Sequence, residues 1–158
     1  MRVRRQELPE FVGNVMSMLA IRPRKNVATV IGLHGELGAG KTTFVQEVAK
    51  KLGVGEKVQS PTYVLIKKYQ IPTQGDALAP RLSKASPFSE LVHIDAYRLN
   101  SAGEFAALRI GEIFGDSANL IFIEWPERVS AALPAPDLVI KFSSEGAGES
   151  ERFIEIEK

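Results

Sequence analysis

The chain has 158 residues, of which 44% are hydrophobic and 25% charged, with a formal net charge of +1 and no cysteine. Such a chain is long enough to fold as one domain, 1–158, around a core that needs neither disulfide bonds nor a structural metal. The balanced charge argues against a protein that binds nucleic acid mainly through electrostatics. We find no apolar segment of bilayer length and no leader pattern, and therefore expect a cytoplasmic protein that does not contact a membrane.

The first half of the chain alternates helical and strand-like patterns. Apolar residues recur at i, i+3, i+4 and i+7 in two segments, which is the spacing of an amphipathic helix. Two shorter runs rich in β-branched residues are typical of strands. In chain order, these segments are a helix from Leu8 to Leu19, a strand over 27–33, a helix over 42–52 and a strand over 63–71.

The second half begins with a segment rich in Pro, Gly, Ser and Ala, 72–88, which predicts a long loop. Two apolar runs that each end in a carboxylate flank a weakly helical stretch, and two alternating segments then predict a hairpin. Strands that alternate with helices predict an α/β layered sheet, mostly parallel with antiparallel C-terminal strands and with helices on its faces. The segments concerned are 91–95, 101–114, 120–124, 138–142 and 152–156.

A glycine-rich loop at the first strand–helix junction carries the clearest chemical signal. Its sequence matches G-x-x-x-x-G-K-[ST] at every fixed position and predicts a P-loop NTPase-like fold. Glycines let successive backbone N–H groups surround a phosphate, and the following helix adds its positive end. Lys41 is placed to reach the terminal phosphates and Thr42 to ligate Mg²⁺. The residues of this glycine-rich loop are Gly35, Glu36, Leu37, Gly38, Ala39, Gly40, Lys41 and Thr42.

Two strand-ending acids, Asp95 and Glu124, are candidates for the metal and the attacking water. In a parallel sheet, the carboxyl ends of the strands lie at the same edge as the glycine-rich loop. One acid would hold Mg²⁺ directly or through water, while the other orients or deprotonates a water. The alternative for each is an acid that merely caps the next turn.

A third candidate is the segment Ser60, Pro61 and Thr62, which follows the second predicted helix. A threonine there could close over the γ-phosphate and Mg²⁺, as switch loops of nucleotide hydrolases do. We refer to these residues as the switch-like loop, although a plain turn before a strand is an equal alternative.

Four motifs in order resemble those of the TsaE (YjeE) family of P-loop ATPases. The motifs are Gly-Glu-Leu-Gly-Ala-Gly-Lys-Thr-Thr-Phe at 35–44, Ser-Pro-Thr-Tyr at 60–63, His-Ile-Asp-Ala-Tyr-Arg at 93–98 and Ile-Glu-Trp-Pro-Glu at 123–127. The resemblance extends from about residue 8 to the C-terminus. The sequence differs from the family pattern at two places. It has a long loop at 72–88 where the family usually has a short connection, and it has His34 at a position that is often apolar or acidic.

The resemblance implies a single domain that binds ATP and Mg²⁺ and supports a complex of two proteins, TsaB and TsaD. TsaD transfers the threonylcarbamoyl group to adenosine 37 of tRNA, so tRNA would be contacted only indirectly. By the same resemblance, Lys41, Asp95 and Glu124 are catalytic, and Thr42, Glu124 and Asp95 are the metal candidates. Thr43 and Trp125 join the glycine-rich loop in binding the nucleotide.

Two other functions fit a motif of this kind. A small-molecule P-loop kinase needs an Arg-rich lid, and no compact Arg cluster follows the glycine-rich loop. An assembly module would use nucleotide occupancy to gate a partner complex without productive turnover, and the same groups would serve it. We interpret His93 as a packed structural histidine, because it points to the opposite face of its strand from Ile94.

Overall fold

The computed structural model describes residues 1–23, 25–72, 86–108, 110–148 and 151–157. One seven-stranded sheet runs through the protein in the order β1-β7-β6-β2-β5-β4-β3. Most of the predicted long loop, 73–85, lies outside the described residues. The strands are β1 (Arg2–Arg4), β2 (Thr29–His34), β3 (Ile66–Gln70), β4 (Glu90–Asp95), β5 (Asn119–Glu124), β6 (Leu138–Ser143) and β7 (Glu151–Glu157).

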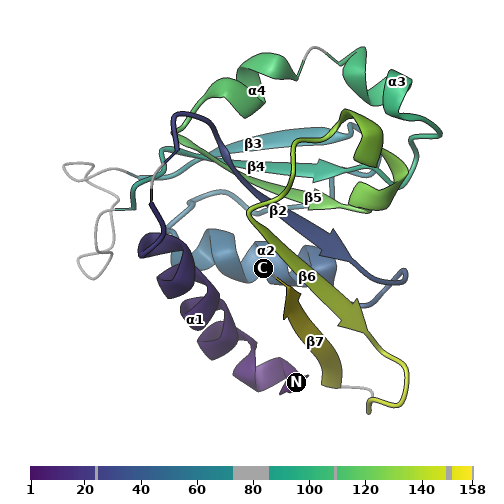
Figure 1. Cartoon of the computed structure of the whole chain (residues 1–158). Helices are drawn as coiled ribbons and strands as arrows, with labels where there is room; N and C mark the ends of the chain where they lie inside the picture. The colour runs from purple at the N-terminus through teal and green to yellow at the C-terminus, as the bar shows by residue number, and fades with distance from the viewer. Residues whose placement is uncertain (24, 73–85, 109, 149–150, 158) are drawn as a thin grey trace.

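Helices lie on both faces of this sheet (Figure 1). On one face α1 and α2 pack together, and on the other lie α3 and α4. Within the described residues, none of the helices is long and apolar enough to cross a bilayer. The helices are α1 (Leu8–Ala20), α2 (Lys41–Lys51), α3 (Ala102–Ala106) and α4 (Gly111–Gly115), with 3-10 turns η1 (Arg5–Glu7), η2 (Pro126–Arg128) and η3 (Ser130–Ala132).

The central strands β6, β2, β5 and β4 pair in parallel, and the predicted C-terminal hairpin is the antiparallel pair β6–β7. The fold class expected from the sequence is therefore confirmed. Two features differ from the prediction: β3 pairs antiparallel with β4 at one edge, and β1 adds an unpredicted strand at the other. A three-residue strand is too short to produce a recognisable pattern.

Some predicted boundaries shift. The stretch 101–114 divides into α3 and α4, and the hydroxyl of Ser101 caps α3 by accepting a hydrogen bond from the backbone N–H of Glu104. The predicted strand 63–71 begins only at Ile66, because residues 62–65 form a turn in which Leu65 has a positive φ of 65°. These segments are short, so local capping and turn formation decide their ends.

Aromatic packing fixes α2 on the sheet. The ring of Phe44, which is fully buried, makes edge-on contacts with Phe11, Phe122 and Phe142 at centroid separations of 5.7–6.0 Å. These rings come from α1, β5 and β6, so one side chain ties the helix to three elements. The start of α2, and with it the end of the glycine-rich loop, is held rigidly above the carboxyl ends of β2 and β5.

Candidate functional site

The glycine-rich loop connects β2 to α2 through backbone conformations that favour glycine. Gly35 has a φ of 134°, and a Cβ there would lie 2.3 Å from the carbonyl oxygen of Phe142. Gly40, with a φ of 102°, leads directly into the first residue of α2. The loop can therefore turn tightly against β6 and direct the first N–H groups of α2 toward a ligand.

Lys41 is a buried cation, only 4% exposed. Its Nζ donates hydrogen bonds to the carbonyl oxygens of Gly35 and Glu36, at 2.7 and 3.0 Å, and lies 4.0 Å from the ring centroid of Trp125. Burial lowers the pKa of this ammonium, although the charge of Glu124 acts in the opposite direction. A desolvated ammonium held in this way is suited to bind an anion.

The two predicted acids lie side by side at the ends of neighbouring strands. Asp95 of β4 is paired in register with Glu124 of β5, which is in turn paired with Leu33 of β2. Both carboxylates are buried, and the hydroxyl of Thr42 donates to Oε1 of Glu124 at 2.7 Å. The sheet thus brings together the predicted metal ligands Thr42, Glu124 and Asp95.

The switch-like loop is attached to Asp95. The hydroxyl of Thr62 donates to Oδ2 of Asp95 at 2.5 Å, and Ser60 Oγ lies 2.6 Å from Thr62 Oγ1. The backbone N–H of Tyr97 donates to the other carboxylate oxygen at 2.9 Å. Pro61 is buried, and its carbonyl accepts hydrogen bonds from the turn that follows. The acid therefore has hydroxyl partners from the switch-like loop.

Trp125 adopts an unusual backbone conformation, with φ of 59° and ψ of 47° in the left-handed region. Its N–H donates to the carbonyl of Leu33 at 3.2 Å, and its ring packs against Tyr97 with centroids 5.2 Å apart. A bulky residue in this region costs on the order of 1–3 kcal/mol, and such strain concentrates at functional sites. The conformation places the indole against the ammonium of Lys41.

These residues line one cavity of about 220 Å³. Gly35 and Glu36 are not among its lining residues, but their carbonyls hold Lys41. The carboxylate of Glu36 instead accepts hydrogen bonds from the backbone N–H and hydroxyl of Ser144. The predicted residues that line the cavity are Leu37, Gly38, Gly40, Lys41, Thr42, Thr43, Ser60, Thr62, Asp95, Glu124 and Trp125, and Tyr97 lines it as well.

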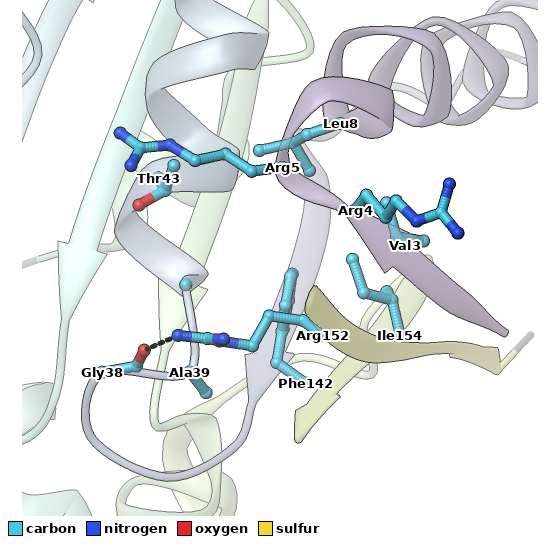
Figure 2. A pocket seen from close by; sticks show the side chains of 11 residues that line it. Val3, Arg4, Arg5, Leu8, Gly38, Ala39, Thr43, Phe142, Arg152 and Ile154 are labelled. Carbon is cyan, nitrogen blue, oxygen red and sulfur yellow. Dashed lines mark hydrogen bonds between the residues drawn. The ribbon is translucent and has the colours of Figure 1, made fainter. Parts of the chain in front are cut away.

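A second cavity of about 230 Å³ is also lined by the glycine-rich loop (Figure 2). Both cavities share Gly38, Gly40 and Thr43, and Ala39 lines only the second. The other residues that line the second cavity come from the two ends of the chain and from β6. One of them, Arg152, reaches the carbonyl of Gly38 with its guanidinium at 3.5 Å. The sequence analysis did not predict that these residues line a cavity, because no local spacing connects them. They are Val3, Arg4, Arg5, Leu8, Phe142, Arg152 and Ile154.

The contact between His93 and Glu124 was likewise not predicted from the sequence. The histidine is fully buried, as expected of a packed histidine, but its Nε2 lies 2.8 Å from Oε1 of Glu124. The alternation of side chains along β4 was the available signal, since it places His93 on the same face as Asp95.

A parallel strand that leads through a glycine-rich loop into a helix, with a buried acid at the end of the neighbouring strand, defines a P-loop NTPase-like α/β protein. The chain belongs to the TsaE family. The family model described as "Threonylcarbamoyl adenosine biosynthesis protein TsaE" matches residues 6–154. The resemblance inferred from the four motifs is thereby confirmed.

Individual relatives support the same family assignment. The tRNA threonylcarbamoyladenosine biosynthesis protein TsaE of Bacillus subtilis (strain 168) is 34% identical over 122 residues, which cover 77% of this chain and 66% of that protein. Its counterpart in Haemophilus influenzae is 27% identical over 128 residues, which cover 81% of this chain and 71% of that protein. A crystal structure of Bacillus subtilis YdiB matches with a TM-score of 0.64 and 26% identity, covering 98% of this chain and 80% of that chain. The match to the first relative thus spans slightly less than two thirds of its length.

Proposed function

We propose that this chain binds ATP with Mg²⁺, hydrolyses it, and by this cycle supports a TsaB–TsaD-like complex that modifies adenosine 37 of tRNA. The observation that carries the proposal is the buried Lys41 ammonium, which shares one cavity with two hydroxyl–carboxylate pairs, Thr42–Glu124 and Thr62–Asp95. Lys41 makes no ion pair within the described part of the chain, and two of the three N–H groups of its ammonium donate to backbone carbonyls. A phosphate chain would accept the third N–H and form a direct ion pair with the ammonium.

The two cavities would accommodate the two ends of a nucleotide. The triphosphate would lie on the side of Lys41, where the acids and hydroxyls are, and the nucleoside would extend past Thr43 into the second cavity. There, Leu8, Phe142 and Ile154 offer apolar contacts to a base, and arginine side chains also line the cavity, that of Arg152 extending to the carbonyl of Gly38 (Figure 2). An apolar pocket with a few polar groups is the usual form of a nucleoside site. Among the described residues that line the two cavities, none specifies adenine over guanine.

A magnesium ion would depend on the nucleotide as well as on the protein. Among the described residues there is no cluster of three or more Asp, Glu or His side chains that could hold a metal unaided. Thr42 and Glu124 would hold Mg²⁺ directly or through water, which is how this ion commonly binds beside phosphates. When bound, it neutralises the negative charge that develops on the phosphates during transfer.

Asp95 and Thr62 would act on the attacking water. The buried carboxylate of Asp95 can accept a proton or orient a water, provided that the hydroxyl of Thr62 moves off Oδ2. The switch-like loop would then respond to the γ-phosphate, since Thr62 can exchange its bond to Asp95 for one to phosphate or metal. Next along the chain, Tyr63 and Val64 are 84% and 58% exposed, and they offer an apolar contact to a partner protein.

The test combines binding and turnover. ATP binding is measured by calorimetry with and without Mg²⁺, and phosphate release is measured with and without a TsaB–TsaD complex. We expect weak hydrolysis by the isolated chain, faster hydrolysis with the complex, and tighter association with the complex in ATP than in ADP. Absence of nucleotide binding would refute the proposal. Binding without partner-stimulated turnover would favour the nucleotide-gated assembly module, and rapid phosphorylation of a small acceptor would favour the kinase.

A further inference from the structure

His93 occupies a position in β4 where an apolar side chain would be expected. Its neighbours Leu91, Val92 and Ile94 are fully buried, and the imidazole itself has no exposed surface. A buried polar ring costs free energy unless its nitrogens have partners. This histidine therefore needs a reason beyond packing.

Only one nitrogen of the ring has a partner. Nε2 lies 2.8 Å from Oε1 of Glu124, and Nδ1 is buried without a hydrogen-bond partner among the described residues. A carboxylate can only accept, so Nε2 carries the hydrogen of this bond. The ring is half satisfied, and the one bond that it makes is to a proposed metal-binding residue.

Oε1 of Glu124 thus accepts two hydrogen bonds, from residues of two different elements. One comes from the hydroxyl of Thr42 at the start of α2, at 2.7 Å, and the other comes from His93 in the neighbouring strand. The threonine hydroxyl can donate to Glu124 while its lone pair faces a metal. Oε2 accepts no hydrogen bond from residues in the described ranges and remains available to a metal or its water.

We propose that His93 is a positioning residue, which holds Glu124 in the rotamer that faces Thr42 and Mg²⁺. The inference rests on the proposed function, because it assigns His93 to the metal end of that site. Partners that orient metal-binding carboxylates typically contribute about 10–100-fold to metal affinity or activity. Loss of the His93 bond should therefore weaken the effect of Mg²⁺ on nucleotide binding, and should change metal-free nucleotide binding much less.

Three variants separate this role from packing. His93→Leu removes the donor and keeps an apolar side chain of similar size. His93→Gln restores a donor, because its amide nitrogen is the same number of bonds from Cβ as Nε2 of histidine. Val92→Ala is the matched control, since Val92 is equally buried in the same strand but packs in the cluster on the opposite face.

The readout is nucleotide affinity in Mg²⁺ and in EDTA, measured from the change in Trp125 fluorescence on nucleotide binding. This residue is the only tryptophan in the chain, and its ring contacts Lys41. Melting temperatures and circular dichroism verify that each variant is folded. The quantity compared is the ratio of Kd in EDTA to Kd in Mg²⁺.

We expect this ratio to fall by about 10–100-fold in His93→Leu and to stay within about threefold of wild type in His93→Gln and Val92→Ala. An unchanged ratio in His93→Leu, or equal losses in the leucine and glutamine variants, would overturn the positioning role. An equal loss in Val92→Ala would assign the effect to packing and would also overturn it. If the wild-type protein binds no nucleotide in either buffer, the proposed function itself fails. That result is distinguishable from failure of the positioning role, which requires a wild type that binds nucleotide.

Discussion

Replacing Lys41 with alanine should weaken ATP binding by about 30- to 150-fold and leave the protein folded. The ammonium is already 4% exposed in the free protein, so the cost of removing it from water precedes nucleotide binding. At an effective dielectric constant of about 20, an ammonium about 4 Å from one phosphate charge gains about 4 kcal/mol. Nζ must first leave the carbonyls of Gly35 and Glu36, which costs about 1–2 kcal/mol in total. The remaining 2–3 kcal/mol, at about 1.4 kcal/mol per factor of ten, gives the stated change in Kd.

Calorimetric titration of ATP into wild type and Lys41→Ala measures this difference. Lys50→Ala is the matched control, because Lys50 belongs to the same helix and its side chain is 77% exposed. The control should bind ATP within about twofold of wild type, since solvent-exposed charges contribute little to interaction energies. Unchanged affinity in Lys41→Ala would refute the phosphate role of the lysine. An equal loss in Lys50→Ala would show that affinity depends on the net charge of the helix rather than on the position of Lys41.

Three further predictions concern the acids, the switch-like loop and the glycine-rich loop. Asp95→Ala and Glu124→Ala should lower the rate of phosphate release by about 100-fold or more while changing ATP affinity much less, and normal turnover in both variants would make these acids structural. Thr62→Ala should reduce the preference of a TsaB–TsaD complex for the ATP-bound protein over the ADP-bound protein in sedimentation experiments; association that is identical with ATP, ADP and no nucleotide would contradict a switch. Hydrogen bonds from Ser144 lower the pKa of Glu36 below its usual 4.5, so their stabilising effect is complete above that value and is lost as pH falls through the lower folded value. The melting temperature should therefore fall less steeply in Glu36→Gln than in wild type below about pH 4.5, and parallel curves would exclude this contribution.

The contacts of the strained Trp125 connect Lys41 with the surroundings of Asp95. The indole contacts both Lys41 and Tyr97, and the N–H of Tyr97 donates a hydrogen bond to Asp95. On the proposed function, a phosphate that drew Lys41 toward itself would change the contact with Trp125 and, through Tyr97, the surroundings of the switch-like loop. These contacts connect Lys41 to Asp95 through two aromatic residues, Trp125 and Tyr97.

The sequence by itself determined the parts of this protein that depend on local pattern. The glycine-rich loop could be predicted because its glycines, Lys41 and Thr42 occur at fixed spacing between a strand and a helix. Asp95 and Glu124 could be predicted to lie together because parallel strands end at a common edge, and their register confirms the expected proximity. Family membership followed from four motifs in order, which are likewise local.

Only the tertiary structure decided what depends on residues distant in the chain. β3 has a strand-like sequence, but its antiparallel direction is set by pairing with β4, which no periodicity encodes. The second cavity is built from Arg5 near one end of the chain and Arg152 near the other, brought together because β1 pairs with β7. The bond between His93 and Glu124 depends on the register of two strands to within one residue, since a shift of that size would turn either side chain to the opposite face.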